Sequence, residues 1–529
     1  MKILVAEPMA QAGLELLRSQ PGWEVIASNP KEYAQHLADA DALVVRSAVK
    51  VTSEVLAKAP KLRVIGRAGV GVDNVDLAAA TAAGVLVMNT PGGNAVSVAE
   101  HTLALMLAMA RSIPQASTST KSGKWEKKKF LGNELRGKTL GIIGLGSIGR
   151  EVARRAKAFE MRVVASDPYV SPRVVEEASV ELVELDKLLA EADYISLHMA
   201  LTPETRGMIN RQMIARMKDG VRIVNCARGE LIDAAALKEA IESGKVAGAA
   251  LDVFEVEPPP AGYPLFELET VVATPHIAGS TEEAQEIVGV RIAEQMVEYL
   301  KSGVAINAVN LPALAPEQYR AIEPYIRLAE KLGMFAAQVA TGNPASVRLS
   351  YYGKLAENDT HLIRNAGLAG VLNRWISIKA NLVNAMQIAA ERGLDVVEQH
   401  ERRPQQADSV RLELATDTGL TRVEGAVLMG KPRLIGIDGI RLEATLQGHL
   451  TYLRNRDVPG VIGHVGTVLG RNGINIANFS LGRQEAPEKE GAPLEAVAVV
   501  ETDQAVNETV LAQLREHPAV KLARIVELS

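Results

Sequence analysis

A glycine-rich turn near residue 145 carries the first chemically informative spacing in the chain. Gly144, Gly146 and Gly149 follow an apolar run at 140–143 and precede a stretch with apolar residues at helical spacing. The first glycine permits a tight turn, the second lets a pyrophosphate approach the backbone, and the third lets the helix pack closely on a sheet. The N-terminus of such a helix also offers unpaired N–H groups to the phosphates.

The acid that follows this turn indicates which dinucleotide would bind. Asp167 ends the next apolar run, about 20 residues past the glycines, where a carboxylate accepts from a ribose 2′-hydroxyl. Because a carboxylate repels a 2′-phosphate, the sequence predicts NAD as the cofactor rather than NADP. A glycine-rich turn without a ligand is the alternative, but strand, glycines, helix, strand and acid in this order favour the NAD site.

Three later segments carry side chains suited to hydride transfer, the chemistry that a nicotinamide implies. That reaction needs a cation to hold a carboxylate or carbonyl and an acid/base for the hydroxyl proton. Arg228 follows an apolar strand that ends at Asn225, so it is expected at the carboxyl edge of a parallel sheet, where it could grip a carboxylate with two N–H groups. The alternative is an ordinary surface arginine.

The candidate acid/base is a histidine at the end of another apolar strand. His276 follows the run 271–274, and a histidine at such a position is more often structural. Pairing with an acid such as Glu257 would raise its pKa and fix its tautomer. The sequence alone does not show that the two side chains meet.

Composition excludes several classes of protein. The 529 residues predict several domains, and 47% hydrophobic with 23% charged residues is ordinary for a soluble globular protein. A net charge of −5 argues against general affinity for nucleic acid.

Cys226 is the single cysteine, which excludes an intrachain disulfide and favours a reducing compartment. The N-terminus is typical of a strand rather than a signal peptide, and the longest apolar helical stretch, 103–110, is too short for a bilayer, so we expect a cytoplasmic protein.

The elements that must position these residues alternate between strand and helix, which predicts an α/β fold of two doubly wound, Rossmann-like lobes. We expect a substrate-binding lobe at 1–97 and an NAD-binding lobe at 98–284. A long apolar helix at 95–111 crosses between them, and a helix near 282–300 returns, so residues 285–305 complete a discontinuous first lobe. The strands expected in the first lobe are Lys2–Ala6, Glu24–Ala27, Ala42–Val45, Arg63–Gly66 and Val85–Met88.

A change of composition at 301–316 predicts a domain boundary. Beyond it we expect an α+β intervening domain at 306–446, with helices at 319–333 and 363–392. Short strands are expected there at 346–352, 409–414 and 426–428. Residues 447–529 follow the order strand, helix, strand, strand, helix, strand of a ferredoxin-like module, with an exposed loop at 484–492.

Five segments in order resemble the D-2-hydroxyacid dehydrogenase family: RAGVGVDNVD (67–76), GLGSIG (144–149), NCARGELID (225–233), ALDVFEVEPP (250–259) and TPHIAG (274–279). The resemblance covers roughly residues 1–305. It implies that Arg228 orients the substrate, that His276 transfers the hydroxyl proton and that Glu257 is the partner of that histidine. It also implies that the cofactor is bound by Gly144, Gly146, Ser147, Ile148, Gly149, Asp167, Cys226, Ala227, Asp252, His276 and Gly279.

Within the family, the chain most resembles the long members that act on 3-phospho-D-glycerate. Residues 457–479 are similar to an ACT regulatory module, and the segment 306–446 stands where those members carry an extra allosteric domain. The resemblance implies oxidation of 3-phospho-D-glycerate to 3-phosphooxypyruvate, the first step of L-serine biosynthesis. It implies a substrate site of Arg46, Ser47, Arg67, Gly69, Val70, Asn94 and, from the basic run 124–129 of a neighbouring subunit, Lys127. The alternative for that run is a solvated face.

The resemblance extends to regulation and assembly. It implies an L-serine effector site between two ACT modules, formed by Asn455, Asp457 and Asn475; a dimerisation module without a ligand is the alternative. Val98, Leu105 and Ala108 of the helix 95–111 could pack against another copy in a homo-oligomer, which the resemblance makes a tetramer, or the helix is simply buried between lobes. His101 in this helix is expected to be a core histidine, and no histidine, cysteine or acid cluster has metal-ligand spacing.

Two other functions stay open from the sequence. The same fold and residues would serve a dehydrogenase of glyoxylate, hydroxypyruvate or D-lactate. Some relatives with this fold act as NAD-sensing co-repressor scaffolds, but the complete set of Arg228, Glu257 and His276 favours an enzyme.

Overall fold

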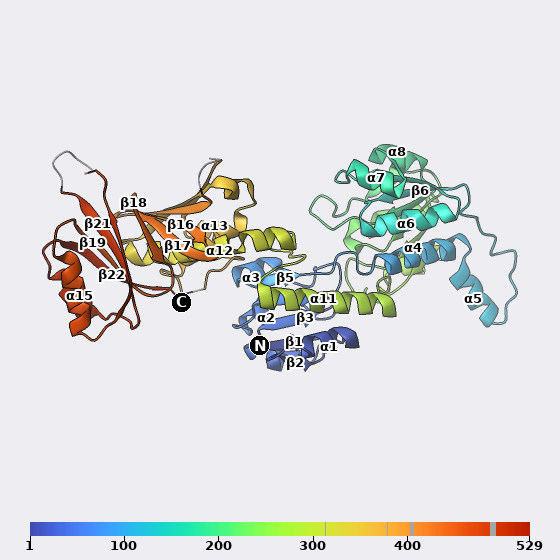
Figure 1. Cartoon of the computed structure of the whole chain (residues 1–529). Coiled ribbons are helices and arrows are strands. Elements are labelled where there is room, and N and C mark those ends of the chain that lie inside the picture. The colour runs from blue at the N-terminus through green and yellow to red at the C-terminus, as the bar shows by residue number, and fades with distance from the viewer. Residues whose placement is uncertain (313, 378, 403–406, 487–492, 529) are drawn as a thin grey trace.

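The computed structural model describes residues 1–312, 314–377, 379–402, 407–486 and 493–528 (Figure 1). The described chain forms four sheets. Two of them belong to the two N-terminal lobes, which face each other, and the other two lie together at the opposite end of the molecule (Figure 1).

The first lobe is a five-stranded parallel sheet in the order β2-β1-β3-β4-β5. Its strands begin and end within one residue of the predicted bounds. Helix α11 (Glu282–Ser302) returns to this lobe, because Ile292 and Met296 pack in one core with Ile3 and Val5. The predicted discontinuous lobe is thereby confirmed. Its elements are β1 (Lys2–Val5), α1 (Gln11–Arg18), β2 (Glu24–Ala27), β3 (Ala42–Val45), α2 (Ser53–Ala57), β4 (Val64–Arg67), α3 (Leu77–Ala82) and β5 (Leu86–Met88).

The second lobe is a seven-stranded parallel sheet in the order β12-β11-β10-β9-β6-β7-β8. The chain direction across the sheet reverses beside β6, and ligands of such sheets bind outside the carboxyl ends of the strands at that point. The strands are β6 (Thr139–Ile143), β7 (Arg162–Ser166), β8 (Glu181–Leu182), β9 (Tyr194–Leu197), β10 (Val221–Asn225), β11 (Val246–Leu251) and β12 (Val271–Ala273). The helices are α4 (Ala95–Ala110), α5 (Ile113–Lys121), α6 (Ser147–Ala158), α7 (Pro172–Ala178), α8 (Leu185–Glu191), α9 (Arg211–Ala215) and α10 (Ala234–Glu242).

Helix α4 belongs to the core of this second lobe. Val98 and Leu105 are each 4% exposed and pack in the same core as α6, so the expectation that they contact another copy is wrong. Ala108 is only partly buried. No single helix in the described parts of the chain is long and apolar enough to cross a membrane; only α4 together with α5, bent by 62°, meets that test, by length and composition.

The intervening domain is a six-stranded mixed sheet in the order β14-β13-β15-β16-β17-β18, covered by two long helices. Three of its strands, β14, β17 and β18, were not predicted, because charged residues interrupt their apolar positions. Its elements are α12 (Pro316–Val339), β13 (Pro344–Tyr352), α13 (His361–Leu372), α14 (Ala385–Glu391), β14 (Asp395–Glu401), β15 (Ser409–Thr416), β16 (Gly419–Leu428), β17 (Lys431–Ile437) and β18 (Ile440–Thr445).

The prediction of one helix over 363–392 is wrong, since the chain leaves the helix after α13 and re-enters it at α14. Asn373 closes the intervening loop. Its side chain accepts from the backbone N of Ala380 at 2.8 Å and donates to the carbonyl of Ala380 at 3.1 Å. Asparagine side chains compete in this way with the backbone bonds of a helix.

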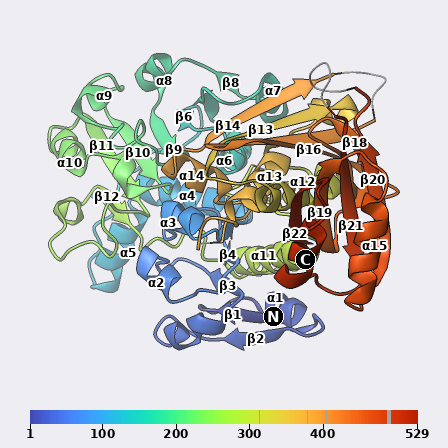
Figure 2. The same cartoon turned by 90° about the vertical axis from the view of Figure 1, so that its left-hand side faces the viewer.

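The C-terminal module has the predicted ferredoxin-like order, with an antiparallel sheet β20-β21-β19-β22. Helices α15 and α16 cover one face of the sheet, and Figure 2 shows α15 on the outer side. The other face shares a core with the intervening domain, where Tyr452 packs edge-on against Phe335 with ring centroids 6.0 Å apart. Residues 487–492 of the expected loop 484–492 lie outside the described residues. The elements are β19 (Gly448–Arg456), α15 (Val461–Arg471), β20 (Ile476–Arg483), β21 (Glu495–Thr502), α16 (Glu508–Arg515) and β22 (Val520–Leu528).

Candidate active site

The turn between β6 and α6 has the shape that a dinucleotide requires. Gly144 has φ +95°, and a Cβ there would lie 2.8 Å from the backbone of His198, so only glycine fits. A Cβ at Gly149 would overlap the carbonyl oxygen of Gly144. At Gly146 a Cβ would meet nothing within 4 Å, which leaves open space over the start of α6. The turn therefore fits the pyrophosphate of NAD, with Ser147 and Ile148 in the first turn of the helix.

The acid at the end of β7 is held by backbone donors. One carboxylate oxygen of Asp167 accepts from the N–H of Leu145 and the other from the N–H of Tyr169, each at 2.8 Å. Each oxygen keeps a further lone pair, so the residue can still accept from a ribose hydroxyl. The bond to Leu145 ties this acid to the glycine turn, and both parts of the dinucleotide site are thereby fixed together.

The histidine and its acid meet. Nδ1 of His276 lies 2.6 Å from Oε2 of Glu257, and Oε1 of Glu257 accepts from the N–H of Phe254 at 3.0 Å. The hydrogen bond to Glu257 raises the pKa of His276 and outweighs the opposing effect of burial. Burial would raise the pKa of Glu257, but the hydrogen bonds from His276 and Phe254 lower it overall. The other ring nitrogen, Nε2, has no partner among the residues that the structure describes.

A fully buried acid shapes the loop that presents His276. Asp252 follows β11, and its carboxylate accepts from the hydroxyl of Thr274 at 2.5 Å and from the N–H groups of Ile277 and Ala278 at 2.9 Å each. These hydrogen bonds and one with His101 lower the pKa of Asp252 against the opposing effect of burial. His276 itself has φ +54°, and its N–H donates to the Asp252 carbonyl at 2.8 Å. The loop thus holds a backbone conformation that a histidine rarely adopts.

Arg228 lies next to this pair and is itself held by an acid from the first lobe. Its Nε and Nη2 lie 2.9 and 2.7 Å from Oδ2 of Asp73, and its Nη1 donates to the carbonyl of Ala227 at 2.6 Å. Gly229, the next residue, packs against the segment that carries Glu257, since a Cβ there would overlap the backbone of Phe254, and the positive charge of Arg228 acts to lower the pKa of His276. An anchoring cation and an acid/base from distant parts of the chain therefore face one place.

A second guanidinium from the first lobe adds to this positive charge. Arg67 ends β4, and burial and the nearby charge of Arg228 lower its pKa to about 10. Its Nε is buried without a hydrogen-bond partner among the described residues. A Cβ at Gly69, which has φ +150°, would overlap the Arg67 guanidinium. Two guanidiniums whose charges act on each other, one of which, that of Arg228, is paired with the carboxylate of Asp73, favour an anionic ligand.

The other predicted substrate residues lie near the carboxyl ends of the strands of the first lobe and near the loop of His276. Arg46 and Ser47 follow β3, where Glu7 binds the backbone N–H groups of residues 46, 48 and 49. The carbonyl of Val70 accepts from Asn89 at 2.5 Å. Oδ1 of Asn94 is buried without a partner among the described residues, and a Cβ at Gly279 would lie 2.7 Å from the Asn94 amide, so Asn94 reaches the loop of His276.

Lys127 is not brought to these residues within the chain. It lies on the exposed loop that follows α5, which protrudes from the second lobe (Figure 1).

Cys226 and Ala227 lie buried directly before Arg228, and burial raises the pKa of the Cys226 thiol to about 12, so it is no nucleophile. Within the described residues, no group of three or more His, Cys, Asp or Glu side chains could hold a metal ion.

Two acids that organise the site were not predicted from the sequence. Asp73 pairs with Arg228, and Glu7 holds the loop of Arg46. Glu7 had a readable signal, because it comes directly after the first strand at the carboxyl edge of the sheet. Asp73 had a weaker one, as an acid six residues past β4 in a glycine-rich segment.

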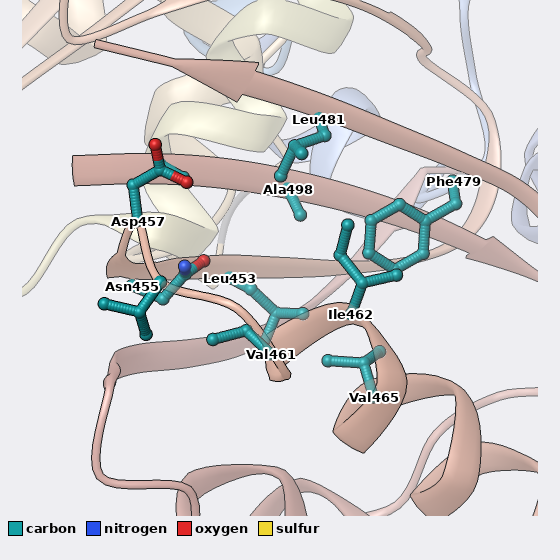
Figure 3. A pocket seen from close by; sticks show the side chains of 11 residues that line it. Leu453, Asn455, Asp457, Val461, Ile462, Val465, Phe479, Leu481 and Ala498 are labelled. Atoms are coloured by element: carbon teal, nitrogen blue, oxygen red, sulfur yellow. The ribbon is translucent and has the colours of Figure 1, made fainter. Parts of the chain in front are cut away.

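The predicted effector residues are divided between two ends of the ACT sheet. Asn455 and Asp457 line an apolar pocket between the sheet and α15, and Figure 3 shows both side chains beside it. Asp457 is paired with Arg483 at 2.5 Å. Asn475 precedes the far end of β20 and binds Asp503 at 2.7 Å, so one chain does not bring the three residues together.

Comparison with known proteins agrees with this geometry. Residues 103–278 match the model of the D-isomer specific 2-hydroxyacid dehydrogenase NAD-binding domain, residues 321–438 that of the D-3-phosphoglycerate dehydrogenase intervening domain, and residues 449–519 that of the ACT domain. The chain is 44% identical to D-3-phosphoglycerate dehydrogenase of Methanocaldococcus jannaschii over 529 residues, the whole of both chains. It is 46% identical to the enzyme of that name from Archaeoglobus fulgidus over 487 residues, which cover 91% of this chain and 92% of the relative.

Among solved structures, the TT0316 protein of Thermus thermophilus aligns with a TM-score of 0.54 at 37% identity. It covers 58% of this chain and 100% of its own. The share covered corresponds in size to the two N-terminal lobes.

Proposed function

Since the chain belongs to the D-3-phosphoglycerate dehydrogenase family, we propose that it oxidises 3-phospho-D-glycerate to 3-phosphooxypyruvate with NAD, the first step of L-serine biosynthesis. The observation that carries the proposal is the pairing of His276 with Glu257 beside Arg228 and Arg67. It supplies a base, a carboxylate anchor and a second cation in one place.

The residues act on three parts of the substrate. Arg228 binds the substrate carboxylate, and its position beside His276 brings the 2-hydroxyl to Nε2. NAD, when bound along the glycine turn, supplies the acceptor for the hydride that leaves C2. His276 takes the hydroxyl proton at Nε2 while Glu257 holds Nδ1–H, which stabilises the imidazolium that forms. The C2–H and O–H bonds break and the C2=O bond forms, so the substrate loses two electrons.

The phosphate of the substrate needs cations of its own. Arg46 and Arg67 are available from the first lobe, and Ser47 and Asn94 add polar groups at the same edge. We assign Lys127 to the phosphate bound in a neighbouring subunit, because its loop protrudes from its own chain.

The proposal is tested by steady-state formation of NADH from 3-phospho-D-glycerate, D-glycerate and D-lactate. Loss of the phosphate should lower kcat/KM by at least about 100-fold, since charge-assisted hydrogen bonds to a phosphate supply that much. If D-glycerate or D-lactate is used as well as the phosphorylated acid, the chain is another D-2-hydroxyacid dehydrogenase of the same family.

We also propose that the protein is a cytoplasmic homo-oligomer, a tetramer, regulated by L-serine. The ACT module, with Asn455 and Asp457 at its pocket, supports the regulatory part of this proposal. In a site between two copies, Asn475 of the partner subunit would complete the binding of serine. Asp457 would bind the ammonium group, and the asparagines the carboxylate and hydroxyl.

A further inference from the structure

The hydrogen bonds of Arg228 divide its guanidinium into a held edge and a free edge. A guanidinium carries one N–H on Nε and two on each terminal nitrogen. Nε donates its N–H to Oδ2 of Asp73 at 2.9 Å, Nη2 lies 2.7 Å from the same oxygen in an ion pair, and Nη1 donates to the carbonyl of Ala227 at 2.6 Å. At least one N–H therefore remains on each terminal nitrogen. Such a pair binds a carboxylate through two parallel hydrogen bonds.

The acid that holds Arg228 comes from the opposite lobe. Asp73 lies six residues past the end of β4 in the first lobe, whereas Arg228 follows β10 in the second. Burial would raise the pKa of Asp73, but the hydrogen bond and charge of Arg228 lower it overall, and the charge of Arg67 acts in the same direction. The ionised carboxylate of Asp73 is thus favoured in its ion pair with Arg228.

The neighbouring Gly71 makes room for this pair. A Cβ at this position would overlap Nη2 of Arg228 and lie 2.7 Å from Oδ2 of Asp73. The φ of Gly71 lies outside the left-handed range, unlike that of Gly69 at +150°. A side chain at 71 would therefore displace the Arg228–Asp73 pair, although the backbone itself would admit one.

We propose that Asp73 is a positioning residue for the substrate carboxylate: it holds the Nε–Nη2 edge of Arg228 across the two lobes so that the terminal nitrogens face the substrate. The inference rests on the proposed function for its substrate, but not for its geometry. The opposing reading is that Asp73 masks Arg228 and competes with the substrate. Positioning is favoured because Asp73 and a substrate carboxylate bound by both terminal nitrogens would use different N–H groups of Arg228.

The two readings predict opposite changes in KM. With Asp73→Asn, KM for the 2-hydroxy acid should rise about tenfold while kcat stays within about twofold, because a charged hydrogen bond that orients the anchor is lost from ground state and transition state alike. KM for NAD should not change. A fall in substrate KM would overturn the proposal and support masking.

Measuring Asp73→Asn in a second enzyme variant, Arg228→Lys, separates a positioning role of Asp73 from a general structural one. In Arg228→Lys the side chain has no Nε–Nη2 edge for Asp73 to hold. The change Asp73→Asn should therefore alter substrate KM less than about twofold in that background. An equal loss in both backgrounds would show that Asp73 acts independently of Arg228, and the proposal would fall.

Two further variants complete the design. Gly71→Ala should reproduce the rise in substrate KM, because its Cβ displaces the guanidinium. Asp76→Asn is the matched control: it makes the same chemical change three residues from Asp73, at the N-cap of α3, and should leave both KM values unchanged.

A crystal structure of ligand-free Asp73→Asn tests the geometry without any turnover. We expect the Arg228 guanidinium to leave the place it holds against residue 73; a guanidinium in unchanged position would overturn the proposal. If the wild type does not oxidise 3-phospho-D-glycerate, the proposed function falls, while this structure and the KM values for the acid that is oxidised still decide the role of Asp73.

Discussion

At the scale of single residues, the neighbours of His276 shift the pKa of this acid/base away from the ordinary value of a histidine. His276 has a raised pKa chiefly because Glu257 accepts from Nδ1, and the negative charge of Asp252 adds to the effect while Arg228 opposes it. For oxidation of a hydroxyl the imidazole must be neutral, and for reduction it must be protonated. The raised pKa thus keeps the imidazole protonated to a higher pH than in a histidine without this partner, and the protonated form is the one that reduction uses.

Replacing the acid should shift the pH dependence in a defined direction. In Glu257→Gln the pKa of His276 falls, so the neutral imidazole persists to lower pH and the acidic limb of kcat/KM for oxidation moves to lower pH. The plateau should also drop by about ten- to 100-fold, since the imidazolium loses its charged partner.

The matched control is Glu255→Gln, which alters an acid two residues away that is not bonded to His276. Its pH profile should superimpose on that of the wild type. An acidic limb that stays in place in Glu257→Gln, or moves to higher pH, would contradict the assigned pairing.

At the scale of elements, the loop after β12 is held by one carboxylate from the end of β11. Asp252 accepts from a hydroxyl and two backbone N–H groups, and it is 0% exposed. An amide has only one accepting atom, so Asn at this position would leave a buried N–H unpaired, which costs about 1–3 kcal/mol.

Asp252→Asn should therefore lower both the melting temperature and kcat, because the loop that presents His276 loses its support. Thermal denaturation and steady-state kinetics measure the two effects. Asp233→Asn, which changes an N-cap acid of α10, should affect stability without the matching loss of kcat. A fully active Asp252→Asn enzyme would contradict the role given to this loop.

The sequence predicted the positions of those residues whose place follows from the strand that directly precedes them. Arg228 and His276 each follow an apolar strand, and parallel strands place such residues at one edge of the sheet. The glycine turn and Asp167 likewise lie within one βαβ unit. No local rule predicts a contact between residues 155 positions apart, so the sequence did not connect Asp73 with Arg228.

The failures have equally specific causes. The apolar pattern at 363–392 suggested one helix, but the side chain of Asn373 closes a loop with Ala380. Helix α4 is apolar on most of its surface, which left open whether another subunit or its own lobe covers it. Asn455 lies near the end of β19 and Asn475 just before β20, and both strands run antiparallel to β21, so the two residues lie at opposite ends of the sheet.

At the scale of the whole molecule, the C-terminal half behaves as one packed unit. One core cluster contains Phe335 of α12 together with Tyr452, Val497 and Val526 of the ACT sheet. The ACT module therefore covers apolar surface that the intervening domain would otherwise expose.

Truncation should reveal this dependence. A chain that ends at residue 446 should aggregate, because the cluster loses its ACT side, whereas a chain that ends at residue 312 should stay monodisperse and retain NADH formation. Size-exclusion chromatography with light scattering measures both. A stable, monodisperse chain of residues 1–446 would show that the two C-terminal modules are independent.

Regulation by serine is the second prediction at this scale. L-Serine should inhibit the wild type, and Asp457→Ala should raise the inhibitory concentration at least about tenfold, as expected for loss of a charged hydrogen bond. Glu516→Ala, which removes an exposed acid elsewhere in the module, should respond like the wild type. Equal inhibition of the two variants would exclude Asp457 from the effector site.

The most direct test of the catalytic account is NADH formation from 3-phospho-D-glycerate by the wild type and His276→Asn, measured side by side with NAD affinity. The account predicts turnover by the wild type, a loss of about 10²–10⁴-fold in kcat for the variant, and unchanged binding of NAD. Turnover by His276→Asn within about threefold of the wild type would contradict it.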